Sequence, residues 1–342
     1  MSEGQSVGEF SAEEASQESF MQKSMRRSIA GFVGAVSATL ILKSQLPVLP
    51  AIVLSLAVGL CIGMWHGFWI AWIGVPSFIV TLGGMLMFRG FTLAILKGSS
   101  LAPLPGSYQF LAAGFLPEIG KVRGLNIMSI LVGLLFSIWY IISEWCRRKQ
   151  ALSYGFTVLA PQLLLIKILA ILATVNYFTI QLSRYRGIPV VLLIIAVLVI
   201  IYTFITQKTI PGRHIYAYGG NKLAAELSGV NTRQVIFLVY ANMGLLAAWS
   251  GIIFTGRLNS ATPKTGMNFE LDAIAACFVG GASMSGGIGT VIGAVVGALL
   301  MGVLNNGMSI LGVSIEWQQA IKGFVLICAV AFDVYAKSGS KA

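Results

Sequence analysis

Long apolar runs alternate with short polar segments along most of the chain. We identify runs near 28–43, 49–73, 77–97, 125–146, 158–183, 188–207, 234–255, 271–287, 289–312 and 316–336. A helix needs about 20 residues to cross the hydrocarbon core of a bilayer, so several of these runs predict spanning helices. The pattern therefore predicts an all-α, polytopic transmembrane helical bundle with eight to ten membrane segments.

Two places depart from a regular crossing. The run 28–43 is short for a span, and the runs 271–287 and 289–312 are short and interrupted by glycine. Each place is a candidate for a broken or re-entrant helix, which is tolerated at membrane depth only where protein or a cavity surrounds the backbone.

Composition agrees with a membrane protein. Of the 342 residues, 56% are hydrophobic and only 10% are charged, whereas soluble domains contain about 25% charged residues. The net charge of +11 comes from basic residues in the short loops between apolar runs, as orientation in a membrane requires. No basic face with interleaved aromatic residues exists, so nucleic acid is not an expected partner.

The basic loops predict the orientation. The loops 147–157 and 208–233 and the tail with Lys337 and Lys341 are rich in Lys and Arg, which favours the cytoplasmic side. With these three inside, alternation holds through every run, and the C-terminus is cytoplasmic. We therefore expect a multi-pass protein of the bacterial inner membrane. The bias is weakened by basic residues on the other side, namely Lys121, Arg123, Arg184, Arg186, Arg257 and Lys264.

The first 27 residues differ from the rest. They hold five of the twelve acidic residues, and a secretory signal would begin with basic residues instead. We interpret 1–27 as a disordered acidic cytoplasmic tail, ending in an inside anchor of Lys23, Arg26 and Arg27. Residues 28–337 are expected to form a single transmembrane domain that contains the cytoplasmic loop 208–233.

Motifs for catalysis or metal binding do not occur. The chain has no Gly-x-x-x-x-Gly-Lys-Ser/Thr motif, so it is not expected to hydrolyse ATP itself. His66 and His214 are isolated, and the four cysteines lack zinc or redox spacing. No metal and no cofactor are expected. Three cysteines inside apolar runs are interpreted as small core residues (Cys61, Cys277 and Cys328), and Cys146 at a helix end as a candidate exposed thiol.

The glycines near the end of the chain carry two interpretations. Gly289, Gly293 and Gly297 are four apart, so they are predicted to share one helix face that another helix approaches closely. A continuous helix is not expected just before them because of Gly280, Gly281, Gly286 and Gly287. The interruption is either a broken helix near a substrate site, as transporters use, or a tight structural turn.

A few ionisable residues fall in or near the apolar runs. Asp272 follows Glu270 near the predicted outer boundary, where it either pairs structurally or accepts hydrogen bonds from the hydroxyl groups of a ligand. Arg89 and Lys322 lie inside runs, and intramembrane charges are functional candidates by default. Lys167 is expected to extend toward the interface.

The loop 208–233 predicts a capped helix. Asn221 is a good N-cap and Gly229 a good helix terminator, with about two helical turns between them. Asn231 and Gln234 form a plausible capping box that opens the next span. Such a helix suits docking in a groove of a partner protein, or it is simply a connector.

Several motifs together resemble a known family. The segment from Arg213 to Val230, with Ala224, Ala225 and Gly229, is similar to the coupling loop of ABC importer permeases. Three further stretches resemble permeases of the ribose/xylose importer family: 75–85 with 88–90, 270–276, and 305–309. The resemblance covers about Ala30 to Tyr335 and is greatest to xylose and multiple-sugar permeases.

The resemblance implies a function and partners. It implies a homodimeric permease that moves a monosaccharide inward, supplied by a periplasmic or extracellular sugar-binding protein and driven by a cytoplasmic ATPase. The ATPase-coupling residues would be Asn221, Lys222, Ala224, Ala225, Glu226 and Gly229. The candidates for the translocation path are Arg89, Asn242, Asp272, Asn305 and Asn306. The alternatives are an ion-coupled secondary transporter and a non-transporting, truncated permease.

The N-terminus departs from the family pattern. Family members begin with about two more spans and an Asp-Leu-Ser-Val-Gly-Ser-like segment, where this chain has Met25-Arg26-Arg27-Ser28. The expected explanations are a truncated gene, a misassigned start or a shortened variant.

Overall fold

The computed structural model describes residues 28–117, 121–122, 125–153, 161–263, 265, 269–283 and 286–338. Most of these residues are helical, and the strands within them are the two-residue β1 (Lys121–Val122) and β2 (Leu125–Asn126), which pair antiparallel. The chain divides into two compact units. One contains the residues up to Gln109 and from Val197 onward, and the other runs from Phe110 to Ala196.

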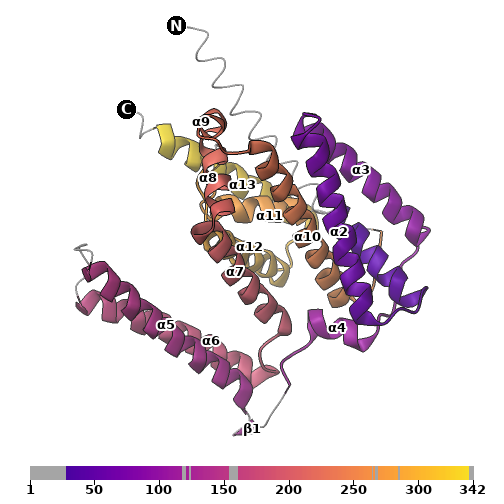
Figure 1. The fold of residues 1–342 in the computed structure, drawn as a ribbon. Helices are drawn as coiled ribbons and strands as arrows, with labels where there is room; N and C mark the ends of the chain where they lie inside the picture. Colours follow the sequence, from indigo (N-terminus) through magenta and orange to yellow (C-terminus); the bar gives the residue numbers. More distant parts are fainter. Residues whose placement is uncertain are drawn as a thin grey trace. The chain divides into compact units, whose positions relative to one another are not determined.

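Figure 1 shows the helices of both units. The unit that contains both chain ends holds an apolar helix Ser28–Leu42, α2 (Val48–Ala71), α3 (Ser77–Leu96), α8 (Ile210–Gly220), α9 (Lys222–Leu227), α10 (Thr232–Leu258), α11 (Phe269–Val279), α12 (Val291–Ile310) and α13 (Ile315–Ser338). The other unit contains α5 (Ile127–Ser153) and α6 (Pro161–Tyr185), while α4 (Gly106–Ala113) and α7 (Val190–Lys208) each extend across a boundary.

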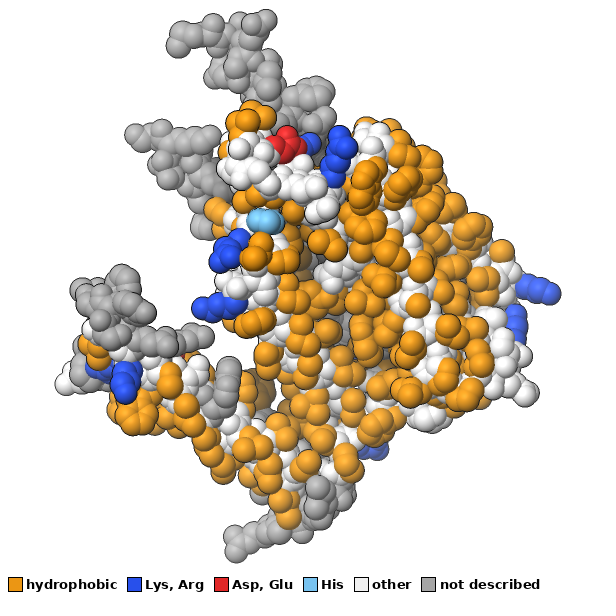
Figure 2. Space-filling model, viewed as in Figure 1, with side chains coloured by type: hydrophobic (Ala, Val, Ile, Leu, Met, Phe, Trp, Pro, Cys, Tyr) orange, Lys and Arg blue, Asp and Glu red, His pale blue; other side chains and the backbone are white. Residues whose placement is uncertain are grey.

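The predicted helical bundle is confirmed. Seven of the described helices are long and apolar enough to cross a membrane, and Ser28–Leu42 is a shorter apolar helix. Each predicted run coincides with a helix to within a few residues, with two exceptions. Helix α5 continues beyond its run to Ser153, and α11 ends before its run does, at Val279. Apolar side chains cover much of the face seen in Figure 2, with Lys and Arg toward its margins, as expected of a surface that faces lipid or other apolar partners.

Helices α2 and α10 form the most closely packed pair. A Cβ added at Gly59 would lie 2.9 Å from Gly244 O, and one at Gly67 would lie 3.1 Å from Phe237 O. Since the later residue of α2 faces the earlier residue of α10, the two helices run antiparallel. Glycines four apart allow this backbone approach.

The helix Ser28–Leu42 packs against the second half of α10. Side chains at Gly34 and Gly251 would collide with Thr255 and with the backbone of Ala30, respectively. The helix therefore runs parallel to the second half of α10, and that it is a broken or re-entrant segment stays a prediction. The predicted tail and inside anchor lie outside the described residues.

Helices α11 and α12 form an antiparallel hairpin. Side chains at Gly293 and Gly297 would collide with Gly280 and Ala276 of the neighbouring segment. The prediction that Gly289 shares this helix face is wrong, because Thr290 caps α12 and Gly289 precedes it. We refer to residues 280–283 and 286–290 as the hairpin tip.

Helices α5 and α6 pack in the other unit. Lys167 of α6 donates to Glu144 of α5 at 2.7 Å, so this lysine forms an ion pair with its neighbouring helix, which the sequence analysis did not foresee. An apolar segment tolerates a lysine more readily when a carboxylate lies within reach.

Candidate functional site

The segment between α7 and α10 folds as two short helices in succession. Helix α8 was not predicted; its N-cap is Thr209, and Pro211 occupies its first turn, where proline is tolerated. Asn221 ends α8 and caps α9, since its Oδ1 accepts a hydrogen bond from Ala224 N at 3.0 Å. Gly229 follows α9 with φ of 83°, which confirms the predicted helix terminator.

Helix α9 is held against the start of α10. Ala225 is buried, and Glu226 Oε1 accepts a hydrogen bond from Thr232 Oγ1 at 2.8 Å. Asn231 Oδ1 accepts from Gln234 N at 3.2 Å and caps α10. Of the six predicted coupling residues, Ala225 and Glu226 thus attach the helix to the membrane domain, and Asn221 and Gly229 define its ends.

The outer face of α9 is apolar. Leu223 and Leu227 are 67% and 82% exposed, and residues four apart lie on the same helix face. Sequence reasoning missed both leucines, although two leucines at this spacing in a polar loop were a usable signal. These two side chains, together with Lys222 and Ala224, form the exposed surface of α9.

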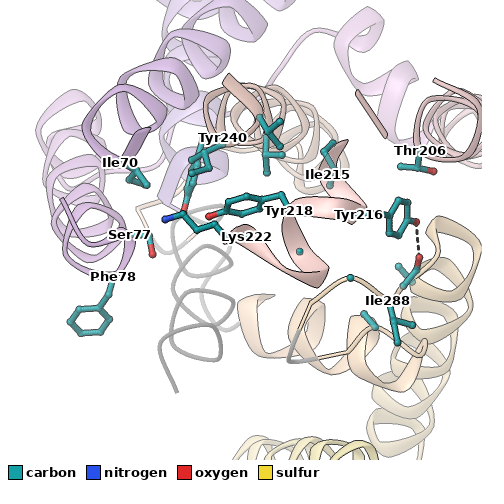
Figure 3. Close-up of a pocket in the computed structure, with 18 of the residues that line it drawn as sticks. Ile70, Ser77, Phe78, Thr206, Ile215, Tyr216, Tyr218, Lys222, Tyr240 and Ile288 are labelled. Carbon is teal, nitrogen blue, oxygen red and sulfur yellow. Dashed lines mark hydrogen bonds between the residues drawn. The ribbon is translucent and has the colours of Figure 1, made fainter. Parts of the chain in front are cut away.

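A cavity of about 890 Å³ lies beside α8 and α9. Its wall combines the ends of α2 and α7, the starts of α3 and α12, parts of α8 and α10, and the hairpin tip (Figure 3). The motif segment 75–79 and the glycine-rich segment 286–290, far apart in sequence, thus meet at one cavity. Lys222 is the only charged side chain among the described residues that line it.

The polar groups of this cavity are mainly hydroxyls. Ser77 Oγ is buried and has no hydrogen-bond partner, while Tyr216, Tyr218 and Tyr240 contribute three phenol groups to the lining. Tyr216 Oη donates a hydrogen bond to Gly289 O at 2.7 Å. A wall of apolar side chains with a few hydroxyls is suited to a neutral ligand with many hydroxyl groups.

The five predicted path residues do not converge on one site. Asn242 of α10 accepts a short hydrogen bond from Tyr202 of α7. Arg89 and Asn306 are exposed. Asn305 Nδ2 donates to Asp272 Oδ2 at 3.1 Å, so these two form a separate cluster between α11 and α12.

Asp272 belongs to an ion pair. Lys322 Nζ of α13 lies 3.0 Å from Asp272 Oδ1, and both side chains are largely shielded from solvent. A carboxylate in an apolar bundle needs such a partner. Of the two roles predicted for Asp272, the ion pair therefore supports the structural one. The side chains of Glu270 and Asp333 lie outside the described residues.

The remaining candidates do not form a reactive site. His66 is fully buried, with Nδ1 2.8 Å from Ile62 O, and in the described part of the chain no three His, Cys, Asp or Glu could hold a metal. The prediction that Cys61 and Cys328 are core residues is wrong, because both are exposed. An apolar run also supplies surface that faces lipid, so a cysteine within it need not be buried.

Comparison with known proteins identifies the family. Residues 28–330 match the family described as branched-chain amino acid transport system / permease component. The chain belongs to this permease family.

The similar proteins within the family are named as sugar permeases. The chain is 38% identical to the xylose transport system permease protein XylH of Haemophilus influenzae, over 91% of this chain and 80% of the relative. It is 36% identical to XylH of Escherichia coli K12 (92% and 78%) and 32% identical to the ribose import permease protein RbsC of the same organism (90% and 75%). No solved structure gives a significant match.

Proposed function

We propose that the chain is the membrane-spanning permease subunit of an ATP-driven importer that moves a monosaccharide inward, with xylose or a related pentose or hexose as the cargo. The observation that carries this proposal is the similarity to two XylH proteins over more than nine tenths of the chain. Membership of a permease family agrees with it.

Helix α9 is the proposed docking surface for a separate ATPase subunit. Its two exposed leucines present an apolar patch that a groove in a soluble partner would bury, which is how an amphipathic helix binds a groove. The helix is attached through Ala225 and Glu226, so a force on the leucines acts on α10 and α8 rather than on a loose loop. The α8–α9 end of the molecule is then cytoplasmic.

The C-terminus is proposed to lie on the same side. Helix α13 runs alongside α11, as the pair Asp272–Lys322 indicates. Both helices head toward the end that carries the hairpin tip, and this tip contacts α8. The hairpin thus supports the orientation that the basic loops predict.

The cavity beside α8 is proposed as the inner end of the sugar path. Its hydroxyl groups and phenol rings offer hydrogen bonds and flat apolar faces to a sugar. Lys222, the one cation among the lining residues that the structure describes, does not demand a charged cargo. A sugar-binding protein and a second copy of the chain complete the proposed assembly, as the family resemblance implies.

The ion pair of Asp272 argues against a secondary transporter. Such proteins use intramembrane carboxylates that bind and release the coupling ion. The charge of Asp272 is already balanced by Lys322, and its Oδ2 accepts a hydrogen bond from Asn305, so the protein itself supplies the cation that a coupling ion would provide.

Uptake of labelled xylose tests the proposal. The chain would be produced with a matching ATPase and binding protein in cells that lack their own pentose importers. We expect uptake that requires an active ATPase and that persists when a protonophore is added while ATP is kept high. Uptake that the protonophore abolishes under these conditions would favour a secondary transporter. Absence of uptake across a panel of monosaccharides would contradict the proposal.

A further inference from the structure

We propose that α8 transmits movement of the docked ATPase to the α11–α12 hairpin through a side-chain-free backbone contact at Gly219 and a hydrogen bond from Tyr216. This inference rests on the proposed function and assigns a role to residues that the docking helix itself does not contain.

The contact between α8 and the hairpin tip is made by backbone. A Cβ added at Gly219 would lie 2.8 Å from Gly287 N, and a side chain at Gly286 would collide with Gly219. No side chain separates the two segments, so no rotamer change can absorb a displacement of α8. A shift at this point must move the tip or break the contact.

Tyr216 adds a directed bond on the same face. It lies three residues before Gly219 and therefore on the same side of α8. Its Oη donates to Gly289 O at 2.7 Å, as the dashed line in Figure 3 shows. This bond satisfies a carbonyl of the tip, which lies outside the regular helices and lacks their internal hydrogen bonds.

A displacement of α9 also displaces Gly219, because α8 and α9 are directly connected. Asn221 is both the C-cap of α8 and the N-cap of α9, so one residue separates the two helices. A displacement of the exposed leucines of α9 therefore displaces the C-terminal turn of α8, where Gly219 lies.

The backbone of the hairpin tip contains several glycines, whose dihedral angles can change at little steric cost. Gly281, Gly286, Gly287 and Gly289 all have positive φ values, between 70° and 156°, where glycine carries no steric penalty. Two backbone hydrogen bonds, Ser283 N to Ile288 O at 3.1 Å and Gly286 N to Ser283 O at 3.3 Å, close the turn. Short glycine segments of this kind absorb the dihedral changes of a hinge.

The tip also forms part of the cavity wall. Ile288 and Gly289 line the cavity on one side, and Tyr216 lines it from α8. A displacement of α8 that the tip follows would change the width of this cavity. The contact would thereby link ATP-driven movement to the inner end of the proposed sugar path.

Two adjacent glycines provide the test. The permease would be assembled with its ATPase in proteoliposomes, supplied with binding protein, and measured for xylose moved per ATP hydrolysed. Gly219→Ala inserts a methyl group into the contact, whereas Gly220→Ala meets no atom within 4 Å. Alanine is the better helix former in both places, so weakening of α8 would not explain a difference.

We expect Gly219→Ala to keep ATP hydrolysis and to lower the xylose moved per ATP by about fivefold, a typical size for a coupling effect. Gly220→Ala should match the wild type. Tyr216→Phe removes only the hydroxyl and should lower the ratio by about twofold. If the Gly219→Ala permease does not assemble with its ATPase, the ratio measured for Tyr216→Phe alone tests the inference. An unchanged ratio in the assembled variants, with a transporting wild type, overturns this inference only, while a wild type that moves no sugar overturns the proposed function as well.

Discussion

Two glycine-packed helix pairs in this protein differ in where their glycines lie. In α2 and α10, of 24 and 27 residues, the contacting glycines are inside regular helices and the partner backbone fills the space above them. In the α11–α12 hairpin, glycines also pack inside α12, but others with positive φ form the tip that α8 contacts. The same residue type therefore serves fixed packing in one pair and a deformable connection in the other. Helix α9 packs on the start of α10 in the first pair, whereas the tip of the second pair contacts α8, the helix that precedes α9.

The largest expected loss of stability concerns α2 and α10, which we call the fixed pair. Gly63→Val would place a Cβ 2.9 Å from Ala241 O and force α2 and α10 apart. We expect a loss of about 3 kcal/mol in the free energy of unfolding, or a failure to fold. Thermal denaturation in detergent measures the loss. Gly83→Val in α3, where an added Cβ meets nothing within 4 Å, is the matched control, and equal losses would contradict the assignment of the fixed pair.

Tyr108 packs on the helix Ser28–Leu42, which lies along the C-terminal half of α10. It is fully buried and shares a 2.7 Å hydrogen bond with Ser37 of the helix that lines α10. Burial raises the pKa of the Tyr108 phenol to about 12, and the hydrogen bond with Ser37 lowers it by less. The folded state thus holds the proton more tightly than the unfolded state, whose tyrosine pKa is 10.0.

Stability should therefore fall as the pH rises from about 10 to about 12. The stabilisation is fully present below pH 10, and the expected loss is roughly 2–3 kcal/mol. Denaturation of the wild type and of Tyr108→Phe across this range isolates the contribution, because the variant lacks this titration. If the stability of the wild type and of the variant falls equally over this range, Tyr108 is not the group that causes the loss.

The ion pair at the far end of the hairpin should matter less. Lys322→Met leaves Asp272 without its cation in a mostly shielded position, and we expect a loss of about 1–2 kcal/mol, reduced by partial exposure. Combining Lys322→Met with Asp272→Asn should restore part of the stability. Because the pair is structural in this account, xylose uptake per folded molecule should persist in the double variant, and its abolition would place Asp272 in the sugar path.

A change in energy of similar size is expected at the end of α9. Gly229 has φ of 83° with open space around it, so Gly229→Val introduces backbone strain of about 1–2 kcal/mol without a clash. We expect membrane insertion to be intact and ATPase affinity to fall by about tenfold. Gly98→Val is the control, since Gly98 has φ of 73° and equally open space after α3. It should leave the affinity unchanged, and a similar fall in both variants would remove the special role of α9.

The sequence predicted the helices well and the contacts between them poorly. Apolar runs near the length of a span located the long helices, because lipid forces the backbone of such a run to form its hydrogen bonds within a helix. Helix α8 escaped prediction because Pro211 and Gly212 disfavour helix interiors, although both lie in the first turn after the Thr209 cap. Gly289 was assigned to α12 by spacing alone, which the cap at Thr290 overrides.

In the candidate site, too, local structure could be predicted from the sequence but tertiary contacts could not. Capping rules located α9 and its ends, since caps depend on neighbouring residues only. Which of its side chains face outward depends on the packing of Ala225 and the bond from Thr232 to Glu226, and these partners are set by tertiary structure. The cavity joins segments separated by about 200 residues, a juxtaposition that one sequence does not reveal.

Binding of the ATPase subunit to the purified chain in lipid nanodiscs decides whether α9 is the docking surface. Leu227 and Leu311 are 82% and 81% exposed, but Leu227 ends α9, whereas Leu311 follows α12 at the end away from the hairpin tip. We predict that Leu227→Glu weakens ATPase binding by about tenfold or more, as expected for the centre of an interface, and that Leu311→Glu binds like the wild type. Equal binding by both variants would contradict the claim that α9 is the surface through which this permease engages its ATPase.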